Sequence, residues 1–121
     1  MTEAWIIDAC RTPRGIGKAG KGALAGIHPH HLGATVLKAI AERNNLNTAD
    51  VDDIIWGTSS QRGEQGSDLG RMAALEAGYD VKSSAMTKVI PVKIMGIAKG
   101  ECKNRLNKIS MDWGIFIFKN K

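Results

Sequence analysis

The order of hydrophobic and polar positions in the first third of the chain predicts a strand followed by a helix. The run AWIIDA, Ala4 to Ala9, is apolar and rich in β-branched residues, which predicts a short buried strand. His28-Pro29 is a suitable helix start, because proline fits the first turn, and the helical pattern continues to about Arg43. The apolar face of this helix is formed by Leu32, Val36, Leu37 and Ile40.

The middle of the chain repeats the same order of elements. Thr48 is placed to cap a brief helical turn, and DIIWG, Asp53 to Gly57, predicts a second buried strand. After a polar loop, Ser67 or Asp68 caps a second helix, and Gly78 follows where helix ends favour a left-handed conformation. This alternation of strands and helices predicts an α/β fold with parallel strand pairing.

The structural signals weaken after Thr87. KVIPVKIMGIAKG predicts a strand interrupted by Pro91, and GIFIF, Gly114 to Phe118, predicts a short strand; neither has an obvious partner. Residues 1–87 hold nine Lys+Arg and ten Asp+Glu, whereas residues 88–121 hold eight and two. Alanine also falls from thirteen residues to one across this boundary. We therefore divide the chain into a first segment and a divergent basic tail, which we expect to be poorly ordered.

Composition narrows the class of protein. The 121 residues suffice for one domain with a modest core, and 43% hydrophobic with 24% charged residues is ordinary for a globular protein. No apolar run is long enough to span a membrane, so we expect no membrane partner. The two cysteines, Cys10 and Cys102, are too far apart to indicate a disulfide framework, which favours a cytoplasmic location.

The stretch GIGKAGKG, residues 15 to 22, has two partial likenesses to nucleotide-binding loops. Gly15, Gly17 and Gly20 read G-x-G-x-x-G, but the dinucleotide fingerprint needs a helix directly after its glycines, and the next predicted helix starts several residues later. A P-loop needs Ser or Thr after its lysine to ligate magnesium, and Gly22 follows Lys21. We interpret the stretch as a flexible cationic surface loop and expect no nucleotide cofactor.

Four short motifs, in the same order along the chain, carry a family resemblance. They are Arg11-Thr12-Pro13, Leu32-Gly33-Ala34, Val51 to Gly57, and Arg71 to Gly78. As a set, over about two thirds of the chain, they resemble the N-terminal region of the thiolases, the acyltransferases that make or cleave 3-ketoacyl-CoA. The resemblance implies an incomplete N-terminal part of the thiolase α/β fold. It also implies acyl-CoA and CoA as substrates of the parent enzyme, without a further cofactor.

The catalytic motif that the resemblance implies is missing. Thiolases continue from a Thr-containing strand to a nucleophilic cysteine that precedes small residues at a helix N-terminus, where the dipole and a histidine lower the thiol pKa. In this chain Thr87 is followed by KVIPVKIMGIAKGECKN, which has no such motif. The family's histidine motif and second cysteine would lie beyond residue 121. We therefore expect a truncated thiolase-type acyltransferase, inactive as this chain, with no catalytic, cofactor-binding or metal-binding residue.

Two cysteines and a histidine cluster offer alternatives to this view. Cys102 lacks the small neighbours and helix start of the family nucleophile, and Cys10 ends the first strand, where a core position is expected. His28 echoes the histidine motif of thiolases but precedes the first predicted helix. His28 and His31 are spaced to share a helix face, yet no cysteine or acid is close in sequence, which favours a solvated helix start over a metal site.

Two other functions stay open at this stage. The loop QRGEQGSD corresponds to one near the thiolase subunit interface, so the segment would be able to pair with a full-length thiolase or with a second copy of itself. The basic tail, with Trp113, Phe116 and Phe118, would combine phosphate contacts with base stacking on a nucleic acid. The tail contains no recognisable nucleic-acid-binding module, so the thiolase and pairing hypotheses rank before it.

Overall fold

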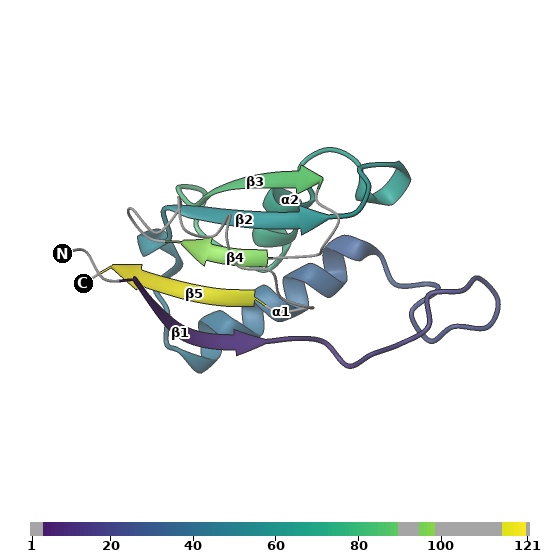
Figure 1. Ribbon diagram of the computed structural model, residues 1–121, viewed down its shortest axis with the longest axis horizontal. Coiled ribbons are helices and arrows are strands. Elements are labelled where there is room, and N and C mark those ends of the chain that lie inside the picture. Colours follow the sequence, from purple (N-terminus) through teal and green to yellow (C-terminus); the bar gives the residue numbers. More distant parts are fainter. Residues whose placement is uncertain (1–3, 90–94, 99–114, 121) are drawn as a thin grey trace.

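Two helices cover one face of a five-stranded sheet in the part of the chain that the computed structural model describes, residues 4–89, 95–98 and 115–120 (Figure 1). The predicted order of strand, helix, strand and helix is confirmed, and a third strand follows the second helix. Two short 3₁₀ turns, η1 (Thr48–Asp50) and η2 (Gly63–Gln65), precede β2 and α2. The strands and helices are β1 (Ala4–Cys10), α1 (Pro29–Arg43), β2 (Asp53–Thr58), α2 (Leu69–Glu76), β3 (Ser84–Val89), β4 (Met95–Ala98) and β5 (Ile115–Asn120).

The sheet combines a parallel pair with antiparallel neighbours, in the order β1-β5-β4-β2-β3. β2 and β3 run parallel, with Asp53 opposite Ser84 and Thr58 opposite Val89. Because parallel neighbours need a crossover connection, α2 completes a β-α-β unit between them. The predicted parallel pairing is therefore found in β2 and β3, while β1 lies at the far edge of the sheet.

The structure gives partners to the strand-like runs of the tail, for which the sequence showed no obvious partner. β4 pairs antiparallel with β2 and parallel with β5, and β5 pairs antiparallel with β1. Strand partners so far apart along the chain leave no local signal in the sequence, because strand propensity depends on the neighbouring strands. Residues 90–94, 99–114 and 121 lie outside the described residues, and with them Cys102, Pro91 and Trp113.

Strand β1 begins at the predicted residue, ends one residue later than predicted, at Cys10, and is not buried as predicted. The side chains of Trp5, Ile6 and Ile7 are 53%, 55% and 47% exposed. β1 is an edge strand with a single neighbour, β5, and an apolar run cannot by itself tell an edge strand from a central one. The run AWIIDA therefore predicted a strand correctly and its position in the sheet wrongly.

Helix α1 begins and ends where its sequence predicts. His28 is the N-cap, and its Nδ1 accepts a hydrogen bond from the amide of His30 at 3.2 Å, with Pro29 in the first turn. Asn44 is the C-cap, and Asn45 follows in a left-handed conformation at φ 50°. The face predicted to be apolar is buried at Val36, Leu37 and Ile40, and Leu32 is half-buried.

Trp56 of β2 lies at the centre of the contact between the sheet and both helices. Its side chain is 5% exposed, and each helix passes it with a glycine. A Cβ added at Gly33 of α1 would lie 2.4 Å from Cη2 of Trp56, and one added at Gly70 of α2 would lie 2.6 Å from its Cβ. Both helices therefore need glycine to approach the indole. The core around it is formed by Val36, Leu37, Ile40, Val51, Ile54, Leu69, Ala73, Ala74 and Tyr79.

Thr48 is not the cap of η1, contrary to the sequence prediction. It connects the start of η1 to the turn before β3. The cap of η1 is Asn47, whose Oδ1 accepts a hydrogen bond from the amide of Ala49 at 3.3 Å. The Oγ1 of Thr48 accepts from the amide of Asp80 at 3.1 Å, and its carbonyl accepts from the hydroxyl of Ser83 at 2.6 Å. Threonine caps helices less well than asparagine, and the longer-range contacts explain the exchange of roles.

Arg71 has a structural role that accounts for an arginine at the start of α2. Its guanidinium donates hydrogen bonds to the carbonyls of Ser83 and of Val81, the latter at 3.0 Å. These carbonyls belong to the turn that leads into β3, so Arg71 fixes the path from helix to strand. A bidentate donor suits two backbone acceptors of one turn.

Asp8 joins β1 to the end of α1. Its Oδ1 accepts from Nη2 of Arg43 at 2.9 Å and its Oδ2 accepts from Nδ2 of Asn44 at 2.8 Å. The hydrogen bond from Asn44 is the largest cause that holds the pKa of Asp8 below its ordinary value of 3.8. The amide of Ala9 and the charge of Arg43 act in the same direction.

Among the described residues, no helix combines the length and apolar character needed to cross a membrane.

Replacing Gly33 or Gly70 by alanine is expected to lower the free energy of unfolding by about 1–3 kcal/mol, because the new methyl group overlaps the buried side chain of Trp56. The usual effect of Gly→Ala inside a helix is a gain of up to about 1 kcal/mol, so the sign is informative. Urea titration measures the change. Gly26→Ala is the control, since no atom lies within 4 Å of a Cβ added there. Unchanged stability in both helix variants would contradict the described packing.

Asp8→Asn is expected to weaken the dependence of stability on acid pH. Because the folded state lowers the pKa of Asp8, its ionised form stabilises the fold above the ordinary value of 3.8, and this contribution is lost as the pH falls below it. Urea titrations between about pH 6 and pH 3 should show a larger loss in the unmodified protein than in the variant. Glu64→Gln, at an exposed position, is the control. Equal losses in the unmodified protein and Asp8→Asn would refute the role of this contact.

Candidate functional site

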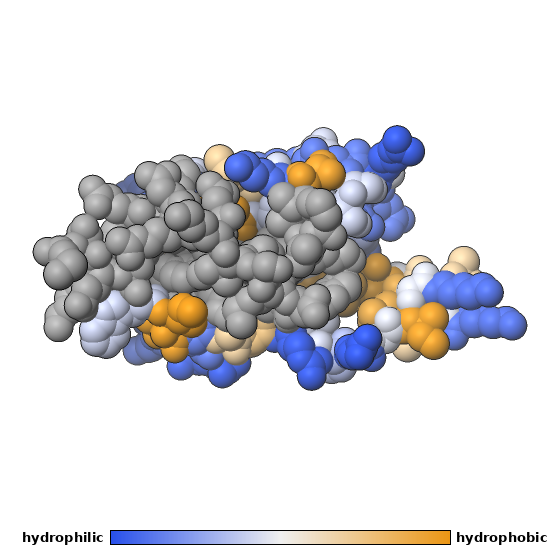
Figure 2. Space-filling model, in the orientation of Figure 1, coloured by the Kyte–Doolittle hydropathy of each residue, from blue (hydrophilic) through white to orange (hydrophobic). Residues whose placement is uncertain are grey.

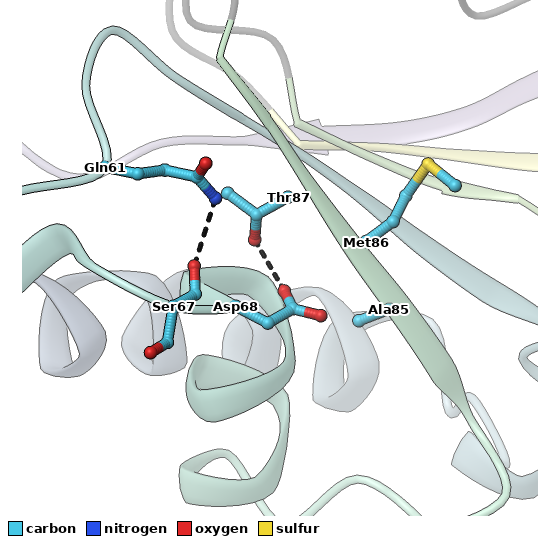
Figure 3. Close-up of a pocket in the computed structure, with 6 residues that line it drawn as sticks. All are labelled: Gln61, Ser67, Asp68, Ala85, Met86 and Thr87. Carbon is cyan, nitrogen blue, oxygen red and sulfur yellow. Dashed lines mark hydrogen bonds between the residues drawn. The ribbon is translucent and has the colours of Figure 1, made fainter.

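An open hollow of about 520 Å³ lies where α2 begins beside β3 (Figure 3). The polar loop between β2 and α2 forms one side of it and β3 forms the other. In a β-α-β unit the carboxyl ends of parallel strands lie beside the N-terminus of the connecting helix, which is where α/β proteins commonly bind ligands. The lining residues are Gln61, Ser67, Asp68, Ala85, Met86 and Thr87.

A closed hydrogen-bond network occupies the helix side of the hollow. Oδ1 of Asp68 accepts from the hydroxyl of Thr87 at 2.5 Å, as Figure 3 shows. It also accepts from the amide of Arg71 at 3.1 Å. The hydroxyl oxygen of Thr87 in turn accepts from the amide of Gly70 at 2.9 Å. Asp68, one of the two predicted caps, is therefore the N-cap of α2, and Ser67 precedes it at φ 57°. Thr87 connects the helix start to β3.

The network fixes Thr87 in a structural role. A nucleophilic hydroxyl needs a base that is available to take its proton and donors directed at the developing oxyanion. The carboxylate oxygen that accepts the hydrogen bond from Thr87 also caps α2, and the amide of Gly70 donates to the hydroxyl oxygen itself. The arrangement positions β3 against α2.

The loop that borders the hollow is shaped by its own side chains. Nε2 of Gln61 donates to the carbonyl of Ser67 at 3.1 Å, as Figure 3 shows. The hydroxyl of Thr58, at the end of β2, lies 2.9 Å from the carbonyl of Ser60 and 3.1 Å from Oε1 of Gln65. These bonds give the loop QRGEQGSD a defined path.

Cys10, for which the sequence predicts a core position, packs against the core at its edge. It is half-buried against the core, and its thiol donates a hydrogen bond to the carbonyl of Val36 at 3.5 Å. Burial is the largest cause that raises the pKa of the Cys10 thiol, which disfavours the thiolate. A reactive cysteine needs the opposite environment. Cys102, the other cysteine, lies outside the described residues.

The three histidines have separate roles at the start of α1. His28 caps the helix, and its ring meets that of His30 edge to face with centroids 4.3 Å apart. His31 reaches the other helix, where its Nδ1 lies 2.8 Å from Oε1 of Glu76. An acid does therefore accompany His31, although none is near it in the sequence. Within the described ranges no group of three or more metal-ligating side chains occurs.

The glycine stretch is a closed turn and does not lead into a helix. The carbonyl of Lys18 accepts from the amides of Lys21 and Gly22, and Gly20 has a φ of 75°. α1 begins only at Pro29, so the amides of a helix N-terminus do not follow the glycines. This geometry differs from the dinucleotide fingerprint, in which helix and glycines are contiguous.

The sequence did not predict two contacts between residues discussed above. Asp68 was a predicted cap, but its bond to Thr87 joins an α-helix to a strand, and His31–Glu76 joins two helices. Neither leaves a periodic or local signal. A Thr-containing strand after α2 was the only sequence feature that pointed to the first of them.

Comparison with known proteins gives a consistent result. Residues 4–99 match the family model of the thiolase N-terminal domain. The chain is 44% identical over 87 residues to a steroid 3-ketoacyl-CoA thiolase of Mycobacterium tuberculosis, covering 72% of this chain and 21% of that protein. It is 44% identical over 88 residues to a beta-ketoadipyl-CoA thiolase of Acinetobacter baylyi, with the same two coverages. A 3-ketoacyl-CoA thiolase of Shewanella frigidimarina is 39% identical over 88 residues, with coverages of 72% and 22%.

The matches cover most of this chain but only a small part of each related protein. The chain spans about a fifth of the length of the curated relatives it matches. The matched region contains β1, α1, β2, α2, β3 and β4, and with them Trp56 and the residues that line the hollow. The family match also continues past residue 87 to residue 99. The chain therefore belongs to the thiolase family, through a segment of the family's N-terminal domain.

Proposed function

We propose that this chain is a scaffold segment of a thiolase-type acyl-CoA acyltransferase and does not transfer acyl groups by itself. The observation that carries the proposal is that polar residues lining the hollow beside β3 are hydrogen-bonded to one another. The hollow has a family-typical setting between α2 and a Thr-containing strand, but Thr87 and Asp68 are used to join strand and helix. The segment thus supports a site without supplying its reacting groups.

The chemistry of acyl transfer explains which groups are required. A thiolate forms a bond to the acyl carbon of acyl-CoA, the CoA thiol leaves, and a base and oxyanion donors assist. Cys10 does not fit the nucleophile, since its thiol is half-buried, hydrogen-bonded to Val36 and raised in pKa. Under this proposal no described residue has a catalytic, cofactor-binding or metal-binding role.

The proposal includes the division of the chain at residue 87. Support comes from the change in charge and alanine content there. The match to the family model extends past this division, to residue 99. We propose a cytoplasmic location on the basis of the free thiol of Cys10, because a reducing compartment preserves it.

A second candidate function is pairing with a full-length thiolase or with a second copy of this chain. Exposed apolar side chains favour it: Trp5 and Ile6 on β1, and Met72 and Leu75 on α2, are 43–55% exposed. Co-purification of a full-length 3-ketoacyl-CoA thiolase with the tagged chain tests this function. Nucleic-acid binding through residues 88–121 ranks third, and salt-dependent retention on DNA tests it.

The purified chain is expected to show no thiolase turnover. The assay follows cleavage of acetoacetyl-CoA in the presence of CoA, through the loss of the absorbance of the magnesium enolate, and condensation of acetyl-CoA in the reverse direction. A full-length 3-ketoacyl-CoA thiolase is the positive control. Circular dichroism of the same sample shows whether the chain tested is folded.

Two cysteine variants make this assay decisive. Turnover that disappears in Cys102→Ser would refute the proposal and identify Cys102 as the nucleophile. Turnover that disappears in Cys10→Ser, with the fold retained, would refute the structural role assigned to Cys10.

A further inference from the structure

We propose that the β1–α1 loop, residues 11–28, docks this protein on membrane surfaces that contain anionic phospholipids. The loop projects from the sheet beyond the end of β1 (Figure 1). Hydrophilic and hydrophobic atoms lie side by side on this projection (Figure 2). Such docking is peripheral and needs no spanning helix, and it is independent of the acyltransferase scaffold role.

The loop concentrates positive charge that the described part of the chain does not neutralise. No Asp or Glu occurs between Asp8 and Glu42, and Asp8 is already bound to Arg43 and Asn44. In the described residues the loop cations form no ion pair with a carboxylate. An anionic partner is therefore the natural source of countercharge. The exposed cations are Arg11, Arg14, Lys18 and Lys21.

The loop has a defined shape that presents these side chains outward. The amide of Leu24 donates to the carbonyl of Ile16 at 3.1 Å, which closes the loop across its base. A Cβ at Gly15 would lie 2.6 Å from Cγ of Leu24, and one at Gly22 would lie 1.9 Å from the carbonyl oxygen of Ile16. Close approach of the two arms therefore requires glycine, and the closed turn lowers the entropy lost on docking.

An exposed apolar residue among the loop cations favours a lipid surface. Ile16 is 66% exposed, although its backbone is fixed by the bond to Leu24, and it lies between two glycines. An apolar side chain flanked by Lys and Arg matches the boundary between headgroups and acyl chains. A nucleic acid would instead favour aromatic side chains for stacking, and residues 11–28 contain no Phe, Tyr or Trp.

Vesicle sedimentation tests the proposal with the full chain. Vesicles of phosphatidylcholine alone are compared with vesicles that also contain phosphatidylglycerol, at low and physiological salt. We expect binding only to the second kind, weakened by salt. Exchange of all four loop cations for Gln should reduce the partition coefficient at least about tenfold, and Ile16→Ser about threefold. Both variants keep every loop glycine, and circular dichroism checks that they fold.

A matched control variant shows whether vesicle binding depends on the loop cations or on the net charge of the chain. Four exposed cations outside the loop are exchanged for Gln, of which only Lys88 belongs to the basic tail of residues 88–121. Binding should stay within about twofold of the unmodified protein. Equal losses in the control and loop variants would overturn the proposal, as would absence of binding to phosphatidylglycerol vesicles. Loop-dependent binding to an oligonucleotide without vesicle binding would overturn it in favour of a nucleic-acid surface. The control positions are Lys38, Arg62, Lys82 and Lys88.

Discussion

The packing of both helices against the buried side chain of Trp56 determines the rest of this structure. Trp56 projects from β2 into the layer formed by α1 and α2, and Gly33 and Gly70 let both helix backbones approach it. Once these contacts are set, α2 has only a short path to β3, which the network of Asp68 and Thr87 then holds. The hollow beside β3 is thus a consequence of how the core packs, because the same helix start that meets Trp56 also borders it.

The local elements could be read from the sequence because their signals are local. The apolar spacing of α1, proline in its first turn, the cap at Asp68 and the left-handed Gly78 each act within a few residues. The family resemblance depended on motifs whose residues now have physical roles. Gly33 contacts the indole, and Arg71 holds the turn before β3.

The contacts that the sequence did not predict all join distant segments. The exposure of β1, the places of β4 and β5 in the sheet, and the approach of His31 to Glu76 depend on which elements become neighbours. The exchange of roles between Thr48 and Asn47 has the same origin, since Thr48 is drawn to the turn at Asp80 and Ser83. The absence of catalytic groups, by contrast, is an expectation drawn from the missing sequence motifs. It is the main statement of the proposed function.

Formation of an acyl-enzyme tests the central claim, a thiolase-family scaffold without its nucleophile, most directly. The purified chain is incubated with acetyl-CoA, and intact-mass spectrometry under non-reducing conditions detects any covalent adduct on a cysteine. The account predicts no added acetyl group on the chain, beside a full-length thiolase that acquires one. An acetyl group on Cys10 or Cys102, formed as fast as on the full-length enzyme, would contradict it.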